Sequence, residues 1–100
     1  MKIALRPAAE RDIADAMAWY DEQRPGLGDG FLESINVLFG RIQERPSAFP
    51  TTHNAFKRAI LGRFPYTIYF REEGEAVVVF AVYHQRRNPL VLQQRLSDLP

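Results

Sequence analysis

The sequence predicts an α+β fold with the element order β-α-α-β-β-β-(α), in which an antiparallel sheet carries a helical hairpin packed on one face. The first half of the chain holds two stretches whose apolar residues recur at steps of three and four, the spacing of an amphipathic helix. The second half holds short runs rich in Val, Ile, Tyr and Phe, which are typical of strands. Prolines and glycines separate these segments and mark the turns between them.

The first expected elements are a short strand and a long amphipathic helix. Residues 2–6 read K-I-A-L-R, an alternating pattern that Pro7 ends, and proline also suits the first position of a helix. A helix over residues 8–23 follows, with carboxylates on the face opposite its apolar stripe. The stripe consists of Ala9, Ile13, Ala16, Met17 and Tyr20.

A second helix is expected after the turn at residues 24–30, which reads R-P-G-L-G-D-G. Asp29 is the expected N-cap of this helix, which spans residues 31–45. Its apolar stripe consists of Phe31, Ile35, Leu38, Phe39 and Ile42. Two amphipathic helices joined by a short turn form an antiparallel hairpin, and neither buries its stripe without a further layer to pack on.

An antiparallel meander is expected in the second half, beyond a loop at residues 46–55. Its strands cover residues 57–61, 66–71 and 76–83. Residues 77–82 read V-V-V-F-A-V, which is typical of a strand covered on both faces, by the chain itself or by a partner. Because two helices can cover only one face, we predict that a partner protein covers the other. A weak helix over residues 90–96 completes the fold.

Composition places the chain among ordinary globular proteins. Its 100 residues form a single domain, 1–100, with 46% apolar and 25% charged residues. No apolar run reaches ~18 residues and the N-terminal residues do not read as a signal peptide, so we expect a cytoplasmic protein with no membrane partner. The chain has no cysteine, which excludes disulfides and cysteine-based zinc sites.

The charges are unevenly distributed, although the net charge is only +1. Acidic residues gather in the first half, whereas residues 56–71 carry four basic residues and no acidic one. Residues 84–95 add three arginines, again without an acid. One face of the molecule is therefore expected to be basic.

A set of basic and aromatic residues in the second half is the main candidate for a functional site. The set contains Arg58, Arg63, Tyr66, Tyr83, His84, Arg86 and Arg87. In a ribonuclease-like interpretation, the arginines hold a phosphate and His84 serves as general acid or base. In the structural alternative, His84 caps the end of its strand, and the arginines are solvated or paired with carboxylates.

Other motifs indicate neither a cofactor nor a metal. The glycine-rich turn lacks the Gly-Lys-Ser/Thr ending of a phosphate-binding loop and does not follow a strand, so we interpret it as an interhelical turn. Asp12 and Asp15 together with His53 lack the spacing of a metal site. We therefore expect no cofactor and no bound metal.

Residues along nearly the whole chain fall into a known order. They are Ala9, Asp12, Ile13, Ala16, Tyr20, Gly26, Leu27, Gly28, Phe31, Ile42, Pro46, Arg58, Phe64, Pro65, Tyr66, Ile68, Tyr69, Val82, Tyr83, His84, Gln85, Arg87, Pro89 and Arg95. In this order the chain resembles the RelE/ParE superfamily of toxins from type II toxin–antitoxin systems, on the ParE side. The family fold, an antiparallel sheet with a helical hairpin, agrees with the fold expected from the residues.

The resemblance implies a growth-inhibiting toxin, of the kind associated with plasmid stabilization, that a cognate antitoxin neutralises. The ParE-like branch inhibits DNA gyrase, whereas the RelE-like branch cleaves mRNA on the ribosome. This chain ends in S-D-L-P and so lacks the basic-aromatic C-terminal tail of the ribonuclease branch. It also carries Leu92 where ParE-like proteins commonly have a tryptophan.

A gyrase inhibitor without a catalytic residue of its own is therefore the expected function. The expected target-binding residues are Tyr83, His84, Arg86, Arg87 and Arg95. The first alternative is a ribosome-dependent mRNA endoribonuclease that uses Arg58, Arg63, His84 and Arg87. The second is a non-toxic partner-binding module of the same fold. The antitoxin is expected to bind through a disordered tail that folds as a helix in a groove or as an added strand.

Overall fold

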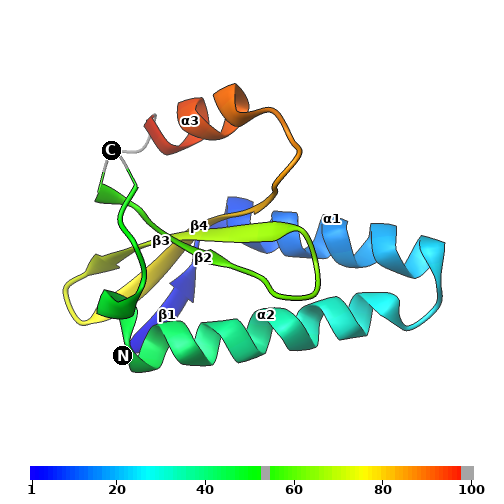
Figure 1. Ribbon diagram of the computed structural model, residues 1–100, viewed down its shortest axis with the longest axis horizontal. Helices are drawn as coiled ribbons and strands as arrows, with labels where there is room; N and C mark the ends of the chain where they lie inside the picture. The colour runs from blue at the N-terminus through cyan, green and yellow to red at the C-terminus, as the bar shows by residue number, and fades with distance from the viewer. Residues whose placement is uncertain (53–54, 98–100) are drawn as a thin grey trace.

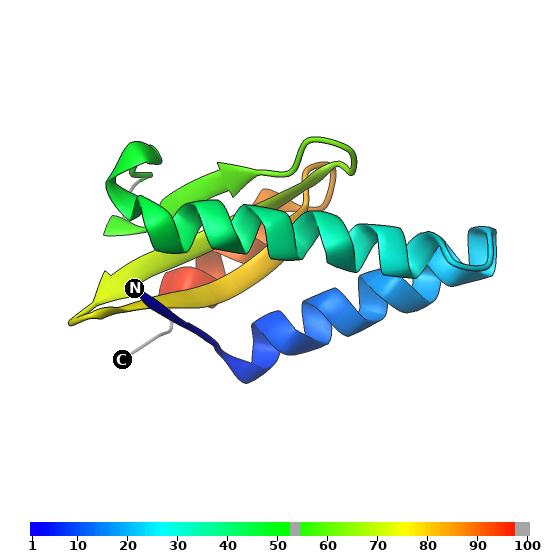
Figure 2. The ribbon, with the colours of Figure 1, turned by 90° about the horizontal axis from the view of Figure 1, so that it is seen from below.

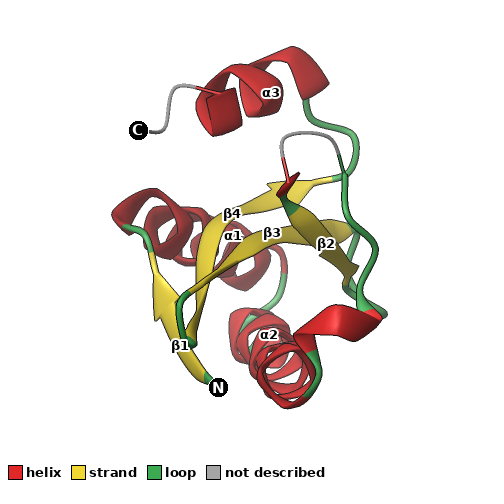
Figure 3. Ribbon diagram, turned by 90° about the vertical axis from the view of Figure 1, so that its left-hand side faces the viewer, coloured by secondary structure: helices red, strands yellow, loops and turns green. Residues whose placement is uncertain are grey.

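The computed structural model describes residues 1–52 and 55–97 and is built in layers (Figure 1). The helical hairpin lies on one face of a central sheet, and the C-terminal helix lies on the other (Figure 3). The elements in chain order are β1 (Lys2–Leu5), α1 (Pro7–Gln23), α2 (Leu27–Glu44), the 3-10 turn η1 (Pro46–Ala48), β2 (Lys57–Ile60), β3 (Tyr66–Glu73), β4 (Ala76–His84) and α3 (Pro89–Ser97). The predicted α+β order is confirmed. Among the described residues, no helix is long and apolar enough to cross a membrane.

The turn between α1 and α2 is tighter than the sequence predicts, although the two helices form the expected antiparallel hairpin (Figure 2). α2 begins at Leu27, because Gly26 adopts a φ of 88° and reverses the chain at once. The prediction that Asp29 is the N-cap is wrong, since Gly26 holds that position and Asp29 lies in the first turn of α2. A carboxylate of α1 instead accepts a hydrogen bond from the first turn of α2, where backbone N–H groups have no partner within the helix. Gly28 donates its N–H to Asp21 Oδ1 at 2.8 Å.

The sheet has the strand order β1-β4-β3-β2 and is mixed. The predicted meander of β2, β3 and β4 is antiparallel throughout. β1, however, pairs parallel with β4, with Lys2 opposite Ala76 and Leu5 opposite Val79. The predicted antiparallel sheet is therefore found for β2, β3 and β4, and the parallel β1 makes the complete sheet mixed. A strand joined to its neighbour by a long connection can take either direction, and an alternating pattern carries no signal for which one it takes.

A β-bulge in β4 decides which side chains face which layer. Phe70 pairs with Val79 but Tyr69 pairs with Ala81, so Phe80 is the extra residue. The bulge changes the phase of the alternation along the strand. Val77, Val79 and Val82 belong to the core under the hairpin, whereas Ala81 and Tyr83 belong to the cluster under α3.

Both faces of β4 are covered by the chain itself, so the prediction that a partner protein covers the second face is wrong. Leu92 of α3 packs against Ala81 and Tyr83. Phe56 meets Phe80 edge to face, with ring centroids 5.1 Å apart. On the opposite face, the stripes of α1 and α2 form one core with the sheet, as predicted from their period.

Beyond the end of β1, side chains form hydrogen bonds with the backbone groups along the edge of β4. Val82 donates its N–H to Asp12 Oδ2 at 2.9 Å, and Arg95 donates from Nη2 to the carbonyl oxygen of Phe80 at 2.9 Å. Arg95 also holds Asp12 through two hydrogen bonds, of 3.0 Å from Nη1 and 2.7 Å from Nη2. This bidentate Asp12–Arg95 pair ties α1, β4 and α3 together.

The close approach of the two helices at Gly28 gives a stability prediction. A Cβ added at Gly28 would lie 2.6 Å from the carbonyl oxygen of Met17 and 2.8 Å from Asp21 Oδ1. Gly28→Ala should therefore lower the free energy of unfolding by about 1–3 kcal/mol.

Gly30→Ala is the matched control, because nothing lies within 4 Å of a Cβ added at this position of the same helix. It should raise stability by up to about 1 kcal/mol. Urea unfolding measures both, and equal effects of the two substitutions would refute the close-packing argument.

The Asp12–Arg95 pair gives a second prediction. The side chains of Arg95 and Asp12 are 24% and 10% exposed, so removing one leaves the other charge poorly solvated. Asp12→Ala should therefore cost about 3 kcal/mol of unfolding free energy. Asp15→Ala, one turn further along the exposed side of α1, should stay within about 0.5 kcal/mol of the unsubstituted protein. If thermal denaturation shows the same loss for both variants, the pair is not the structural contact described here.

Candidate functional site

A small cleft opens where β3 and β4 end beside α1, and we call it the strand-end cleft. It encloses about 210 Å³. Its lining residues are Asp12, Asp15, Ala16, Trp19, Tyr66, Val82, His84 and Arg87. The two strands bring Tyr66 and His84 together, because these residues are partners in the antiparallel ladder. Their rings meet edge to face, with centroids 5.1 Å apart.

His84 is bound into the turn that follows β4. Its Nδ1 accepts the backbone N–H of Arg86 at 3.0 Å, and its carbonyl oxygen accepts the N–H of Arg87 at 3.1 Å. The Nδ1 lone pair is thus occupied, so a neutral His84 carries its proton on Nε2. This geometry matches the structural alternative that the sequence left open, in which His84 holds the strand end.

Arg87 is the cation of the strand-end cleft. Its guanidinium carbon lies 4.8 Å from the centroid of the Tyr83 ring, a cation–π contact. Burial raises the pKa of the Tyr66 hydroxyl, with Tyr20 adding to the rise and Arg87 opposing it. Tyr66 therefore remains a protonated hydrogen-bond donor at neutral pH.

The other predicted site residues lie elsewhere. Tyr83 is buried under α3 and donates its hydroxyl to the carbonyl oxygen of Asn88 at 3.1 Å. Arg86 is exposed and does not line the strand-end cleft. Arg58 lines a cavity between the sheet and α3, next to Tyr69.

Arg63 lines a further cavity beside α2, and Arg95 is held by Asp12. The four residues of the predicted ribonuclease site, Arg58, Arg63, His84 and Arg87, thus line three different cavities. They were placed in one set because all four are basic residues of the second half of the chain, but the alternation of strand residues and the turns between strands direct their side chains to different parts of the surface.

The sequence analysis did not select Trp19, and it considered Asp15 only as a metal ligand; both are cleft residues on the exposed side of α1. Trp19 is the single tryptophan of the chain and is 55% exposed. An unburied tryptophan off the apolar stripe of a helix is the signal that indicates a binding surface here. Asp15 precedes it by one helical turn, so both side chains reach the same side of α1.

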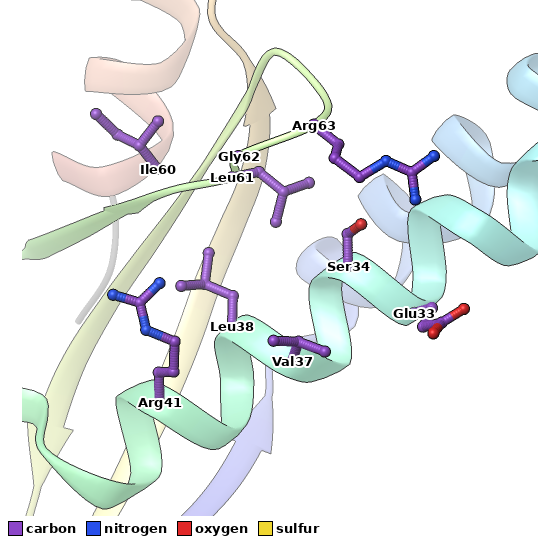
Figure 4. A pocket seen from close by; sticks show the side chains of 9 residues that line it. All are labelled: Glu33, Ser34, Val37, Leu38, Arg41, Ile60, Leu61, Gly62 and Arg63. Carbon is purple, nitrogen blue, oxygen red and sulfur yellow. The ribbon is translucent and has the colours of Figure 1, made fainter.

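A second concave surface lies between α2 and the β2–β3 turn, and we call it the hairpin groove (Figure 4). It encloses about 350 Å³. Leu38 and Leu61 meet between the two elements, with Arg41 and Arg63 on either side of them (Figure 4). Val37, at the mouth of the groove, is 63% exposed. β2 is also an edge strand: one side of it pairs with β3, and on the other side Lys57 forms an isolated bridge with Thr51.

Metal ligands do not gather anywhere in residues 1–52 and 55–97, since no three His, Cys, Asp or Glu side chains are placed to share an ion. His53, one of the residues considered for a metal site from the sequence, lies outside the described residues.

Comparison with known proteins identifies the family. The family model described as ParE toxin of type II toxin-antitoxin system, parDE, matches residues 3–89. Two relatives named Toxin ParE2, from Mycobacterium tuberculosis strains CDC 1551 / Oshkosh and ATCC 25618 / H37Rv, are each 24% identical over 97 residues, which is 96% of this chain and 92% of theirs. A solved structure described as Chromosomal ParDE TA system from P. aeruginosa has the same fold, with a TM-score of 0.76 at 16% identity over 84% of this chain and 95% of that one. The chain therefore belongs to the ParE toxin family of type II toxin–antitoxin systems.

Proposed function

We propose that this ParE-family toxin arrests growth by binding DNA gyrase in the cytoplasm, without a catalytic step of its own. The observation that carries the proposal is the state of His84, whose Nδ1 already accepts the N–H of Arg86. A general base needs a free lone pair within reach of the proton that it removes, and a neutral His84 in this arrangement has none. Inhibition by contact then follows as the simplest mode of action.

The arginines support the same proposal. Phosphoryl chemistry requires cations that converge on one phosphate. Here Arg58 and Arg63 line cavities other than the strand-end cleft, where Arg87 and His84 lie. The strand-end cleft, with its aromatic and arginine residues, is instead composed like the centre of a protein–protein contact. Arg95 is bound within the fold and is not part of the proposed contact surface.

As a toxin of this family, the chain has a cognate antitoxin as its partner. The hairpin groove is the proposed seat of the antitoxin. Its apolar floor suits one face of an amphipathic segment, and Arg41 and Arg63 suit acidic side chains on the flanks of that segment. A disordered antitoxin tail that folds in this groove would bury Val37, which the chain alone leaves in water.

The mechanism is tested by inducing variants in cells that lack the antitoxin. His84→Gln keeps an amide donor but cannot shuttle protons, so growth inhibition should remain close to that of the unsubstituted toxin. Arg87→Ala should relieve growth inhibition, because a desolvated arginine contact contributes about 1.5–3 kcal/mol. Gyrase cleavage complexes and mRNA fragments are measured in parallel. Ribosome-dependent mRNA cuts that disappear in His84→Gln would favour the endoribonuclease and sink the proposal.

The antitoxin seat is tested by a charge placed in the hairpin groove. Val37→Asp should leave the thermal stability and toxicity intact, because the residue is exposed, but should prevent rescue by the co-expressed antitoxin. An uncompensated carboxylate in an apolar contact costs about 2 kcal/mol or more. Ala14→Asp on the exposed side of α1 is the matched control and should still be rescued. Full rescue of Val37→Asp would place the antitoxin elsewhere.

A further inference from the structure

The strand-end cleft presents hydrogen-bond donors that the fold does not use. Within residues 1–52 and 55–97, no side chain or carbonyl oxygen accepts a hydrogen bond from the Arg87 guanidinium, the Tyr66 hydroxyl or the Trp19 indole N–H. The stacking of Arg87 on Tyr83 restricts the guanidinium while its N–H groups remain available. An arginine fork of this kind matches the geometry of a carboxylate or a phosphate.

The charges around the strand-end cleft limit what can enter it. Asp12 is neutralised by its bidentate pair with Arg95, so it does not compete for Arg87. Asp15 has no ion-pair partner among the described residues, and it opposes an incoming anion from the α1 side. A polyanion such as a nucleic-acid backbone would find one arginine in the lining, Arg87, with the Asp15 carboxylate opposing it. The electrostatic repulsion between Asp15 and a single anionic side chain is smaller than that between Asp15 and a chain of phosphates.

The size and the residue composition of the strand-end cleft also favour a protein side chain as its ligand. A cavity of about 210 Å³ holds a side chain rather than a nucleotide with its neighbours. Tryptophan, tyrosine and arginine are the residues that most often dominate protein–protein binding energy, and the strand-end cleft contains one of each. Trp19 and Tyr66 offer apolar ring surface to the stem of an entering side chain, and Arg87 faces its charged end.

We propose that the strand-end cleft receives one acidic side chain of the protein target, with the carboxylate held by the fork of Arg87 and the Tyr66 hydroxyl. The stem of that side chain lies against Trp19. The inference rests on the proposed function in taking the target to be a protein that the toxin contacts. It adds the chemistry of the contact, a partner carboxylate, and it assigns Asp15 as a residue that weakens the contact.

The test measures the affinity of the purified toxin for purified, DNA-free gyrase. Arg87→Ala should weaken binding about tenfold or more. Arg87→Lys should lose most of the same affinity, because an ammonium group cannot form the two parallel hydrogen bonds. Asp15→Asn should tighten binding about two- to fivefold, since it removes the opposing carboxylate. Arg45→Ala is the control for net charge, because Arg45 follows the end of α2 and does not line the strand-end cleft, and it should bind like the unsubstituted toxin.

Each other outcome overturns a defined part of the proposal. If gyrase binds but Arg87→Lys keeps full affinity, or Asp15→Asn does not tighten binding, the carboxylate cleft is wrong while the gyrase target stands. If the toxin alone binds a DNA duplex and Arg87→Ala abolishes this, the cleft serves a phosphate and the inference is wrong. If gyrase does not bind at all, the target is wrong, and the cleft is judged by growth inhibition in cells. In cells, Arg87→Lys must weaken growth inhibition and Asp15→Asn must strengthen it; otherwise the proposed carboxylate contact in the cleft is wrong as well. Melting temperatures confirm that the variants, all at exposed positions, remain folded.

Discussion

The ion pair between Asp12 and Arg95 joins three elements, α1, β4 and α3, at one point of the sheet. α3 has only 9 residues, fewer than the ~12–15 that an isolated helix needs to be even marginally stable in water. Its position depends on Leu92 and Leu96 beneath it and on Arg95 at its far end. The same pair supplies hydrogen-bonding partners for the edge of β4 beyond the end of β1, where unpaired backbone groups would otherwise remain. It also influences the electrostatics of the strand-end cleft, because an Asp12 neutralised by Arg95 does not compete with a ligand for Arg87.

The bulge at Phe80 is the second constraint on the site. A regular strand would place Val79, Ala81 and Tyr83 on one face, but the extra residue moves Val82 and His84 to the side of the hairpin. His84 therefore meets Tyr66 beside α1, and Tyr83 lies buried under α3. β4 has an uninterrupted apolar run because both of its faces pack against apolar layers, the helical hairpin on one side and α3 on the other.

The sequence predicted those parts of the fold that depend on local periodicity. The stripes of α1 and α2 and the meander of β2, β3 and β4 each follow from spacings within one segment. The direction of β1 and the partner of Arg95 could not be predicted, because each depends on residues far apart in the chain. The early start of α2 was missed because an N-cap carboxylate was expected, whereas a left-handed glycine starts this helix. Of the basic and aromatic set selected from the sequence, Tyr66, His84 and Arg87 line one cleft. The same set included Arg58 and Arg63, which line two other cavities. The alternation within one strand does not tell which cavity of the folded protein a residue lines.

The separation in sequence between Asp12 and Arg95 has a consequence for how the toxin matures. The two residues are 83 positions apart, and the pairing of Lys2 with Ala76 also spans most of the chain. Contacts of such high sequence separation form late, because the intervening chain must first be closed into a loop. The contacts between α1 and α2 join neighbouring segments of the chain, so this hairpin can form while the polypeptide is still being synthesised. The parallel edge of the sheet and the wall of the strand-end cleft wait for β4 and α3. A nascent toxin therefore lacks the ion pair that neutralises Asp12, on the wall of its strand-end cleft, until Arg95 has been added and has left the ribosome.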